Sequence, residues 1–261
     1  MSSLVTRLHG FPSMDALTTA AASGMKARME SLEMLANNLA NQASAGYKSD
    51  REFYSLYISP EAVAQADATV VAPPVVPVIE RHWTDFSQGT LAETGNPLHL
   101  ALSGRGFFQV AGPDGPLYTR NGSFHLSRAG RLETQEGYPV LTEAGQPVTL
   151  DPAQSFEISS TGEIRQANAV IRRLGIVDFA QPQELTKRQG TYFQMTDNSM
   201  AAAPAREAVL VQGRLESANQ APSEAAVRLI TVLRQFEMLQ KAVQIGAEMG
   251  RRADEIARVN G

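Results

Sequence analysis

Apolar residues recur every three or four positions in two stretches of the chain, one toward each end. The first stretch contains Leu17, Ala21, Met25, Met29, Leu32, Leu35 and Leu39. The second contains Leu229, Val232, Phe236, Leu239, Val243, Gly246, Gly250 and Ala253. This spacing places apolar side chains on one face of a helix. The second stretch follows a heptad seam, and its small residues predict a close approach of neighbours near the C-terminus.

The middle of the chain, residues 95–199, has a different pattern of short apolar runs separated by turn residues. Pro113-Asp114-Gly115-Pro116, Asn121-Gly122 and Arg128-Ala129-Gly130 are turn signals, because Asp, Asn and Gly accept the backbone angles that turns require. Many short strands with such turns indicate a β-rich domain of the barrel or sandwich type. The predicted fold class is therefore α+β, with terminal α-helices that pair as a coiled-coil-like inner domain and a β-rich middle domain.

The composition along the chain predicts the domain boundaries. Residues 14–58 and 214–261 form the helical inner domain, and residues 95–199 form the β-rich domain. Residues 59–94 and 200–213 are expected to be extended connectors. The first of these is rich in proline, which removes backbone donors and favours extended chain; its prolines are Pro60, Pro73, Pro74 and Pro77.

The composition and the spacing of reactive residues exclude several classes of function. Cysteine is absent, so disulfides, thiolate metal sites and cysteine nucleophiles are excluded. The four histidines lack the i, i+4 spacing of a helical zinc site, and no serine lies in a GxSxG elbow. The formal net charge of −4 gives no sign of a nucleic-acid partner. We therefore expect no catalytic residues, no metal and no cofactor. No run of residues is apolar and long enough to predict membrane insertion.

The two helical stripes have two interpretations. They could close a small core within one molecule, or they could bind helices of other subunits. Burying a Leu, Phe or Met contributes about 1.5–3 kcal/mol, so ten such residues contribute on the order of 20 kcal/mol before ordering costs. An isolated helix pair would stay marginal. Assembly is favoured, through Met25, Met29, Leu32, Leu35, Leu39, Leu229, Val232, Phe236, Leu239 and Val243.

A second class of function is a cell-wall carbohydrate-binding protein that uses the β-rich region. Trp83, Phe107 and Tyr138 could stack on sugar rings. However, the sequence has no evident pair of acidic residues for cutting a glycan. Peptidoglycan binding, and its loss on mutation of Trp83, would distinguish this alternative from a structural subunit.

Three groups of motifs resemble those of the flagellar axial proteins, the family of rod, hook and hook-associated subunits. The N-terminal group is Ala21-Ala22-Ser23-Gly24-Met25, Leu35-Ala36-Asn37-Asn38-Leu39-Ala40-Asn41 and Gly46-Tyr47-Lys48. The middle group is Gly104–Val110, Tyr118–Phe124 and Gly137–Leu141, and the C-terminal group is Val211–Asn219 with Arg234-Gln235-Phe236-Glu237. The resemblance extends over nearly the whole chain from Met14 onward.

The resemblance implies a rod subunit, because hook subunits carry additional outer domains. The opening motif and the Arg-Gln-Phe-Glu stretch are more similar to the proximal-rod FlgF type, and the distal-rod FlgG type is the runner-up. A rod subunit would be a homo- and hetero-oligomer with other rod subunits. It would be exported by the flagellar type III apparatus to the periplasmic rod, which is consistent with the lack of a secretory signal in residues 1–13.

In such a subunit, the terminal helices would line a hollow rod and the β-rich domain would pack outside them. The motif residues Asn37, Asn38, Leu39, Ala40, Asn41 and Gly46 would lie where the first helix ends and the chain turns outward. Asn side chains there can satisfy backbone groups that the helix end leaves without partners.

The front of the chain departs from the family pattern. Thirteen residues precede Met14, where family members usually begin, and Met14-Asp15-Ala16-Leu17 resembles a natural start. We therefore treat residues 1–13 as an N-terminal extension whose presence in the mature subunit is an open alternative. The intact mass of rod-associated protein distinguishes the two starts.

Overall fold

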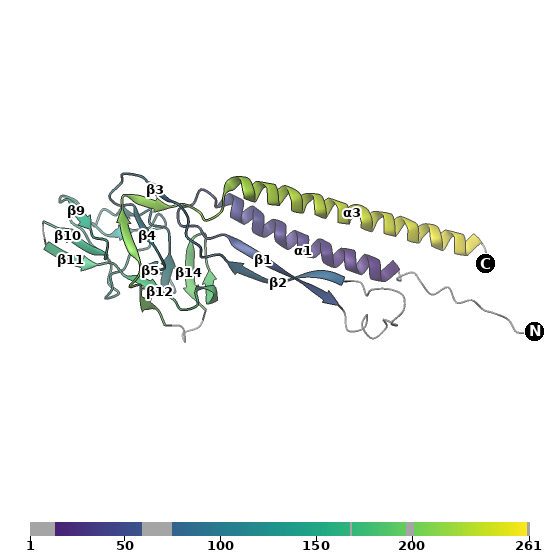
Figure 1. The fold of residues 1–261 in the computed structure, drawn as a ribbon, viewed down its shortest axis with the longest axis horizontal. Coiled ribbons are helices and arrows are strands. Elements are labelled where there is room, and N and C mark those ends of the chain that lie inside the picture. Colours follow the sequence, from purple (N-terminus) through teal and green to yellow (C-terminus); the bar gives the residue numbers. More distant parts are fainter. Residues whose placement is uncertain (1–13, 59–74, 168, 197–200, 260–261) are drawn as a thin grey trace, which may run out of the picture. The chain divides into compact units, whose positions relative to one another are not determined.

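The computed structural model describes residues 14–58, 75–167, 169–196 and 201–259. The fold is α+β, with a helix toward each end of the chain and strands between them (Figure 1). Helix α1 spans Met14–Ala40 and helix α3 spans Pro222–Val259. Both helices were predicted from the apolar spacing, and Pro222 and Glu224 stand in the first turn of α3, where proline and acidic side chains are favourable. The N-terminal extension lies outside the described residues.

The strands occupy the region between the two helices. They are β1 (Asp50–Ile58), β2 (Val75–Thr84), β3 (Leu91–Glu93), β4 (Leu100–Ser103), β5 (Phe107–Gly112), β6 (Gly115–Thr119), β7 (His125–Leu126), β8 (Leu132–Glu133), β9 (Phe156–Ile158), β10 (Glu163–Gln166), β11 (Ala169–Arg173), β12 (Ile176–Asp178), β13 (Leu185–Lys187), β14 (Tyr192–Met195), β15 (Ala203–Pro204), β16 (Val209–Gln212) and β17 (Arg214–Glu216). A short 3₁₀ helix, η1, spans Pro182–Glu184.

The described chain divides into two compact units. The helical unit contains residues 14–36, 52–58, 75–82 and 227–259, and the β body contains residues 37–51 and 83–226 apart from the undescribed positions. In the helical unit, β1 pairs with β2 as a two-stranded sheet. The two helices approach each other there, since a Cβ added at Gly24 of α1 would lie 3.5 Å from a methyl carbon of Leu239 in α3.

The β body is built around an antiparallel sheet with the strand order β13-β14-β6-β5-β12-β15. Three further pairs, β16-β4, β17-β3 and β7-β8, and a three-stranded sheet, β11-β10-β9, complete the described strands. The β-rich character is therefore confirmed, and a closed barrel or sandwich stays a prediction. Strand β3 and strand β16, both in segments expected to be extended, pair with β17 and β4 respectively.

Strand β5 separates two hydrophobic cores. Phe108 and Val110 belong to the larger core, together with Leu132 and Leu210, whereas Phe107 packs in a smaller aromatic core with other rings. Successive side chains of a strand point to opposite faces, so the adjacent Phe107 and Phe108 enter different cores. The smaller core contains Phe107, Tyr118, Phe179, Leu185 and Phe193.

The turn predictions have different outcomes. Pro113 and Asp114 form the tip of the β5–β6 hairpin, and Gly130 has a φ of +74° in the turn after Ser127, as predicted. Asn121-Gly122 is not a hairpin turn. Close packing requires glycine at position 122 instead, because a Cβ there would lie 1.6 Å from the carbonyl oxygen of Leu100.

Candidate functional site: the motif junction and the faces of the terminal helices

Residues from all three motif groups meet inside the β body. The backbone nitrogen of Gly46 donates a hydrogen bond to the carbonyl oxygen of Glu216 at 2.6 Å. A Cβ at Gly46 would lie 2.2 Å from the carbonyl carbon of Arg120. We call this meeting point the motif junction and define it as Asn38, Tyr47, Lys48, Asp50, Arg120, Lys187, Glu216 and Asn219.

A buried carboxylate between two cations lies at the centre of the motif junction. Lys48 Nζ is 2.6 Å from Glu216 Oε1, and Arg120 Nη1 is 3.2 Å from Glu216 Oε2. The side chains of Lys48 and Glu216 are fully buried. The backbone nitrogen of Gly89 also donates to Glu216 Oε1 at 2.9 Å. Burial lowers the pKa of Lys48, while the charge of Glu216 acts in the opposite direction. The carboxylate is therefore the group that makes burial of both cations tolerable.

The same two cations also bind backbone carbonyls. Lys48 Nζ donates to the carbonyl oxygen of Ser87 at 2.7 Å, and Arg120 Nη1 donates to that of Leu102 at 3.1 Å. Arg120 Nη2 donates to the carbonyl oxygen of Gly104. These bonds attach Lys48 to the segment before β3, and Arg120 to β4 and to the residue that follows it. Charge-assisted bonds of this kind are the stronger hydrogen bonds of proteins.

Asn38 closes the chain reversal that follows α1. Its Nδ2 donates to the carbonyl oxygen of Asp50 at 2.8 Å, and its Oδ1 accepts from the Asp50 nitrogen and from the Tyr47 hydroxyl, both at 3.0 Å. Asn41 Nδ2 donates to the carbonyl oxygen of Asn37, one turn earlier, at 2.9 Å. A buried amide that satisfies three partners defines the path of residues 38–50.

Lys187 joins the motif junction from β13. Its Nζ is 2.8 Å from Asp50 Oδ2 and donates to the carbonyl oxygen of Lys48 at 2.7 Å. It also lies over the Tyr47 ring, 4.0 Å from the ring centroid, in a cation–π contact. Burial lowers the pKa of Lys187, and Asp50 opposes that shift. The sequence analysis missed Lys187, because no motif surrounds it and only tertiary pairing brings β13 to Asp50.

Asn219 connects the start of α3 with the N-terminal motif. The Ser49 nitrogen donates to Asn219 Oδ1 at 2.8 Å, and Asn219 Nδ2 donates to the carbonyl oxygen of Asp85 at 2.6 Å. The segment after α1 and the segment before α3 are thus held together within the β body. The arrangement is a structural connection made by hydrogen bonds and ion pairs.

Gly46 offers a direct test of the close packing at the motif junction. Its φ of +67° disfavours side chains, and an added Cβ would also collide with the Arg120 backbone. Gly145 has a similar φ of +74° with nothing within 4 Å of an added Cβ. We expect Gly46→Ala to reduce the free energy of unfolding by about 2 kcal/mol more than Gly145→Ala, as measured by urea denaturation. Equal losses would show that the close approach is unimportant.

The predicted assembly residues of α1 differ in their exposure. Leu35 is fully buried, Met25, Leu32 and Leu39 are partly buried, and Met29 is 50% exposed. The most buried line on this helix consists instead mainly of small or polar residues, namely Gly24, Ala27, Ser31, Leu35 and Asn38. The buried side of α1 is therefore shifted around the helix relative to the apolar residues that the sequence indicated, and only Leu35 of the predicted assembly residues is on it.

The predicted assembly residues of α3 lie on one partly buried face. Val232 is buried, and Leu229, Phe236, Leu239 and Val243 are partly buried. Other large apolar side chains of α3 are exposed. Four of them share the side of α3 opposite Val232 and Phe236, and we call these the outer stripe: Val227, Met238, Ile245 and Met249. The sequence analysis missed the outer stripe, although Met238 and Ile245 are one heptad apart and could have indicated it.

The aromatic residues of the carbohydrate alternative do not form one platform. Trp83 is 38% exposed, whereas Phe107 is buried in the aromatic core. Tyr138 instead packs edge-on against Tyr192, with ring centroids 5.3 Å apart. A sugar-binding surface needs exposed ring faces, and only one of the three residues offers a substantial one.

Within the described part of the chain, no group of His, Asp and Glu side chains is arranged to hold a metal ion. No helix there is both long and apolar enough to cross a membrane.

Comparisons with known proteins agree with the motifs. The family "Flagellar hook protein FlgE/F/G D1 domain" matches residues 101–166, and the family "Flagellar basal body rod FlgEFG protein C-terminal" matches residues 211–256. The flagellar basal-body rod protein FlgF of Caulobacter vibrioides is 31% identical over 88% of this chain and 93% of its own length. The chain belongs to the FlgF/FlgG family of flagellar basal-body rod proteins. Two FlgG proteins, from Agrobacterium fabrum and Borreliella burgdorferi, are each 32% identical and are covered over 94% and 96% of their lengths.

As a member of the FlgF/FlgG family, the chain is a structural subunit and not an enzyme. It assembles with other components of the flagellar basal body. The resemblance found in the sequence is thereby confirmed at the level of the FlgF/FlgG type. Relatives of both types have similar identity to the chain, so the assignment to the proximal-rod FlgF type stays a prediction.

Proposed function

We propose that the chain polymerises through α1 and α3 with copies of itself and with other rod subunits, forming the torque-transmitting shaft of the flagellum. The outer stripe of α3 is the observation that carries this proposal. A row of exposed apolar side chains on one side of a long helix, even when polar residues interrupt it, is unfavourable in water and marks an interaction surface. Helix-in-groove packing between neighbouring subunits would remove this row from solvent.

The energies support assembly through this surface. Met238, Ile245 and Met249 are 59–62% exposed. Burying the exposed part of each contributes about 1 kcal/mol, and the gain repeats at each subunit of a polymer. Single contacts of this size are too weak to hold two molecules together, but many in a closed helical array are sufficient.

The motif junction supports the mechanical part of the proposal. It binds the segment that leaves α1 to the segment that enters α3 through Asn38, Asn219 and the buried ion pairs. A buried polar network with several bonds to separate backbone segments restricts the movement of those segments relative to one another. This restraint would keep the chain that follows α1 and the chain that precedes α3 together within the β body while the subunit carries load.

The proposal also includes the route by which the subunit is exported to the rod. The subunit is exported through the flagellar type III apparatus into the periplasmic rod, without a cleaved signal peptide. Long helices that have few partners within one chain are marginally stable in isolation, which favours passage through a narrow channel. The cysteine-free composition avoids wrong disulfides in an oxidising compartment.

Hydrogen exchange tests the role of the helices. In the purified monomer, amides of residues 225–250 should exchange quickly, because local opening of a poorly packed helix costs little free energy. In assembled rods the same amides should be strongly protected, while amides of the β-body core should be protected in both states. Strong protection of residues 225–250 in a proven monomer would contradict the proposal.

A further inference from the structure

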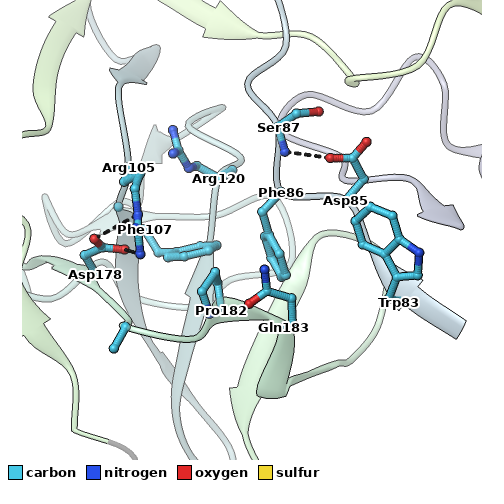
Figure 2. A pocket seen from close by; sticks show the side chains of 12 residues that line it. Trp83, Asp85, Phe86, Ser87, Arg105, Phe107, Arg120, Asp178, Pro182 and Gln183 are labelled. Atoms are coloured by element: carbon cyan, nitrogen blue, oxygen red, sulfur yellow. Dashed lines mark hydrogen bonds and ion pairs between the residues drawn. The ribbon is translucent and has the colours of Figure 1, made fainter. Parts of the chain in front are cut away.

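The β body contains an amphipathic pocket at the start of β5. Its volume is about 320 Å³, and its walls include Trp83, Phe86, Arg105, Phe107, Asp178 and Gln183 (Figure 2). In Figure 2 the rings of Phe86 and Phe107 lie in the middle of the pocket, with Trp83 on one side and Arg105 on the other. Arg120 of the motif junction also lines the pocket.

The apolar part of the pocket is aromatic. Phe86 and Phe107 meet edge-to-face, with centroids 5.6 Å apart and an interplanar angle of 81°. Trp83 is the exposed ring of the group. Aromatic faces of this kind accept flat aliphatic groups, such as a proline ring, with little entropy cost.

The polar part of the pocket has an exposed guanidinium. Arg105 Nε is 3.2 Å from Asp178 Oδ2, and Arg105 Nη2 donates to the carbonyl oxygen of Phe179 at 2.6 Å. The side chain is nevertheless 59% exposed. A guanidinium has five N–H donors, so Arg105 retains donors for a further carboxylate.

The donors left free at the pocket favour an acidic occupant. The pocket lining has two cations, Arg105 and Arg120, and two carboxylates, Asp85 and Asp178. Both carboxylates are already in ion pairs, Asp85 with Arg51 and Asp178 with Arg105. Arg105 is the exposed cation of the two, so its remaining donors are accessible to a further carboxylate. A proline beside a carboxylate would match both parts of the pocket.

The β5–β6 hairpin presents this combination at its tip. Pro113 and Asp114 are exposed and form the two-residue loop between the paired Gly112 and Gly115. Within the described chain, the Asp114 carboxylate has neither a hydrogen bond nor an ion pair. A two-residue loop between two hydrogen-bonded strands is stiff, so the tip can enter a binding pocket without much loss of conformational freedom.

The pocket and the tip lie at opposite ends of β5. Phe107 begins the strand and lines the pocket, whereas Pro113 follows Gly112 at the other end. Six residues of extended strand span about 20 Å. The tip of one molecule therefore cannot reach its own pocket, and it is exposed to other molecules. A contact between two different surfaces of identical molecules propagates into a ring or an open helix.

We propose that the Pro113–Asp114 tip of one copy inserts into the Trp83–Phe86–Arg105 pocket of a neighbouring copy. The proline ring lies against the aromatic side chains, and the Asp114 carboxylate binds Arg105. This head-to-tail contact between β bodies rests on the proposed polymerisation and adds a second link between subunits to the one made by the helices.

Cysteine cross-linking tests the contact in an otherwise cysteine-free chain. Cells that produce Pro116→Cys and Gln183→Cys copies together should yield a covalent dimer on mild oxidation of their basal bodies, because Pro116 is exposed beside the tip and its replacement leaves Pro113 and Asp114 in place. Gln183 lies at the pocket and is exposed. Each variant alone should give no dimer. The matched control combines Pro116→Cys with Arg128→Cys, an exposed position in another turn. Adding Arg105→Glu to the Gln183→Cys copy should lower the dimer yield about tenfold.

The outcomes separate this proposal from the proposed function. Swimming cells whose basal bodies contain both variants but no dimer above the Arg128→Cys control would overturn the pocket contact and leave polymerisation through the helices intact. A cross-link to a different protein, identified by mass spectrometry, would also overturn it. A dimer in basal bodies whose α3 amides stay unprotected would support the pocket contact and contradict the role of the helices.

Discussion

Replacing Met238 and Ile245 together by aspartate should abolish swimming and remove the subunit from basal bodies. Both side chains belong to the outer stripe, are about 60% exposed and lie one heptad apart on α3. Aspartates at these positions meet water in the monomer, so the variant should fold. In a helix interface they would be buried without partners, and each unpaired charge would cost several kcal/mol.

The matched control is Gln240→Asp with Gln244→Asp. These residues are exposed on another side of the same helix, and the variant carries the same added charge. It should swim normally. The measurements are swimming speed in a complemented deletion strain and immunodetection in purified basal bodies. Normal swimming of the Met238→Asp, Ile245→Asp variant would show that the outer stripe is not an assembly surface.

Phe236→Asp is expected to block assembly as well, but for a less specific reason. Phe236 lies on the partly buried face of α3 that also contains Leu239, and Leu239 approaches Gly24 of α1. An aspartate at position 236 therefore disturbs packing inside one chain in addition to any contact between chains. The fold of residues 95–199 should be unaffected. Comparing this variant with the outer-stripe variant separates the two faces of the helix.

Replacing Glu216 by alanine should lower the free energy of unfolding of the β body by about 3–5 kcal/mol. The substitution leaves the buried cations of Lys48 and Arg120 without their shared carboxylate. It also removes the acceptor of the Gly89 nitrogen. Urea denaturation of the full chain measures the effect, with the fluorescence of its single tryptophan, Trp83, as the signal.

Glu93→Ala is the control for Glu216→Ala. Glu93 forms an exposed ion pair with Arg214, 3.8 Å apart, and its loss should change the free energy of unfolding by less than about 0.5 kcal/mol. If the Glu216→Ala variant also lost less than about 1 kcal/mol, the ion pairs of the motif junction would not be a stabilising element. Motility measured beside stability would then show whether the motif junction has a mechanical role beyond folding.

The motif junction and the outer stripe serve different parts of one mechanism. The junction is built from residues near both ends of the β body's sequence, with Tyr47 and Lys48 on one side and Glu216 and Asn219 on the other. It needs no partner molecule to form. The outer stripe is satisfied only by assembly. A subunit with a preformed connection and an unsatisfied helix surface is well suited to polymerise without a further folding step in its body.

The turn at Pro113-Asp114 and both terminal helices could be predicted because their causes are local. Apolar residues at spacings of three and four specify a helix, and a short run of Pro, Asp and Gly specifies a reversal of the chain. The failure at Asn121-Gly122 has a non-local cause. The chain there is shaped by the Leu100 carbonyl, which is distant in sequence.

The amino-acid sequence by itself determined the two terminal helices, the β-rich character of the middle, the lack of cysteine chemistry and the resemblance to flagellar rod subunits. Only the tertiary structure decided which face of α3 is exposed, that Lys187 reaches Asp50, and that Glu216 lies between Lys48 and Arg120. The physical reason is that helix and turn preferences act over a few residues. Burial and ion pairing, in contrast, depend on which distant segments come together, and a periodic pattern does not specify its partner.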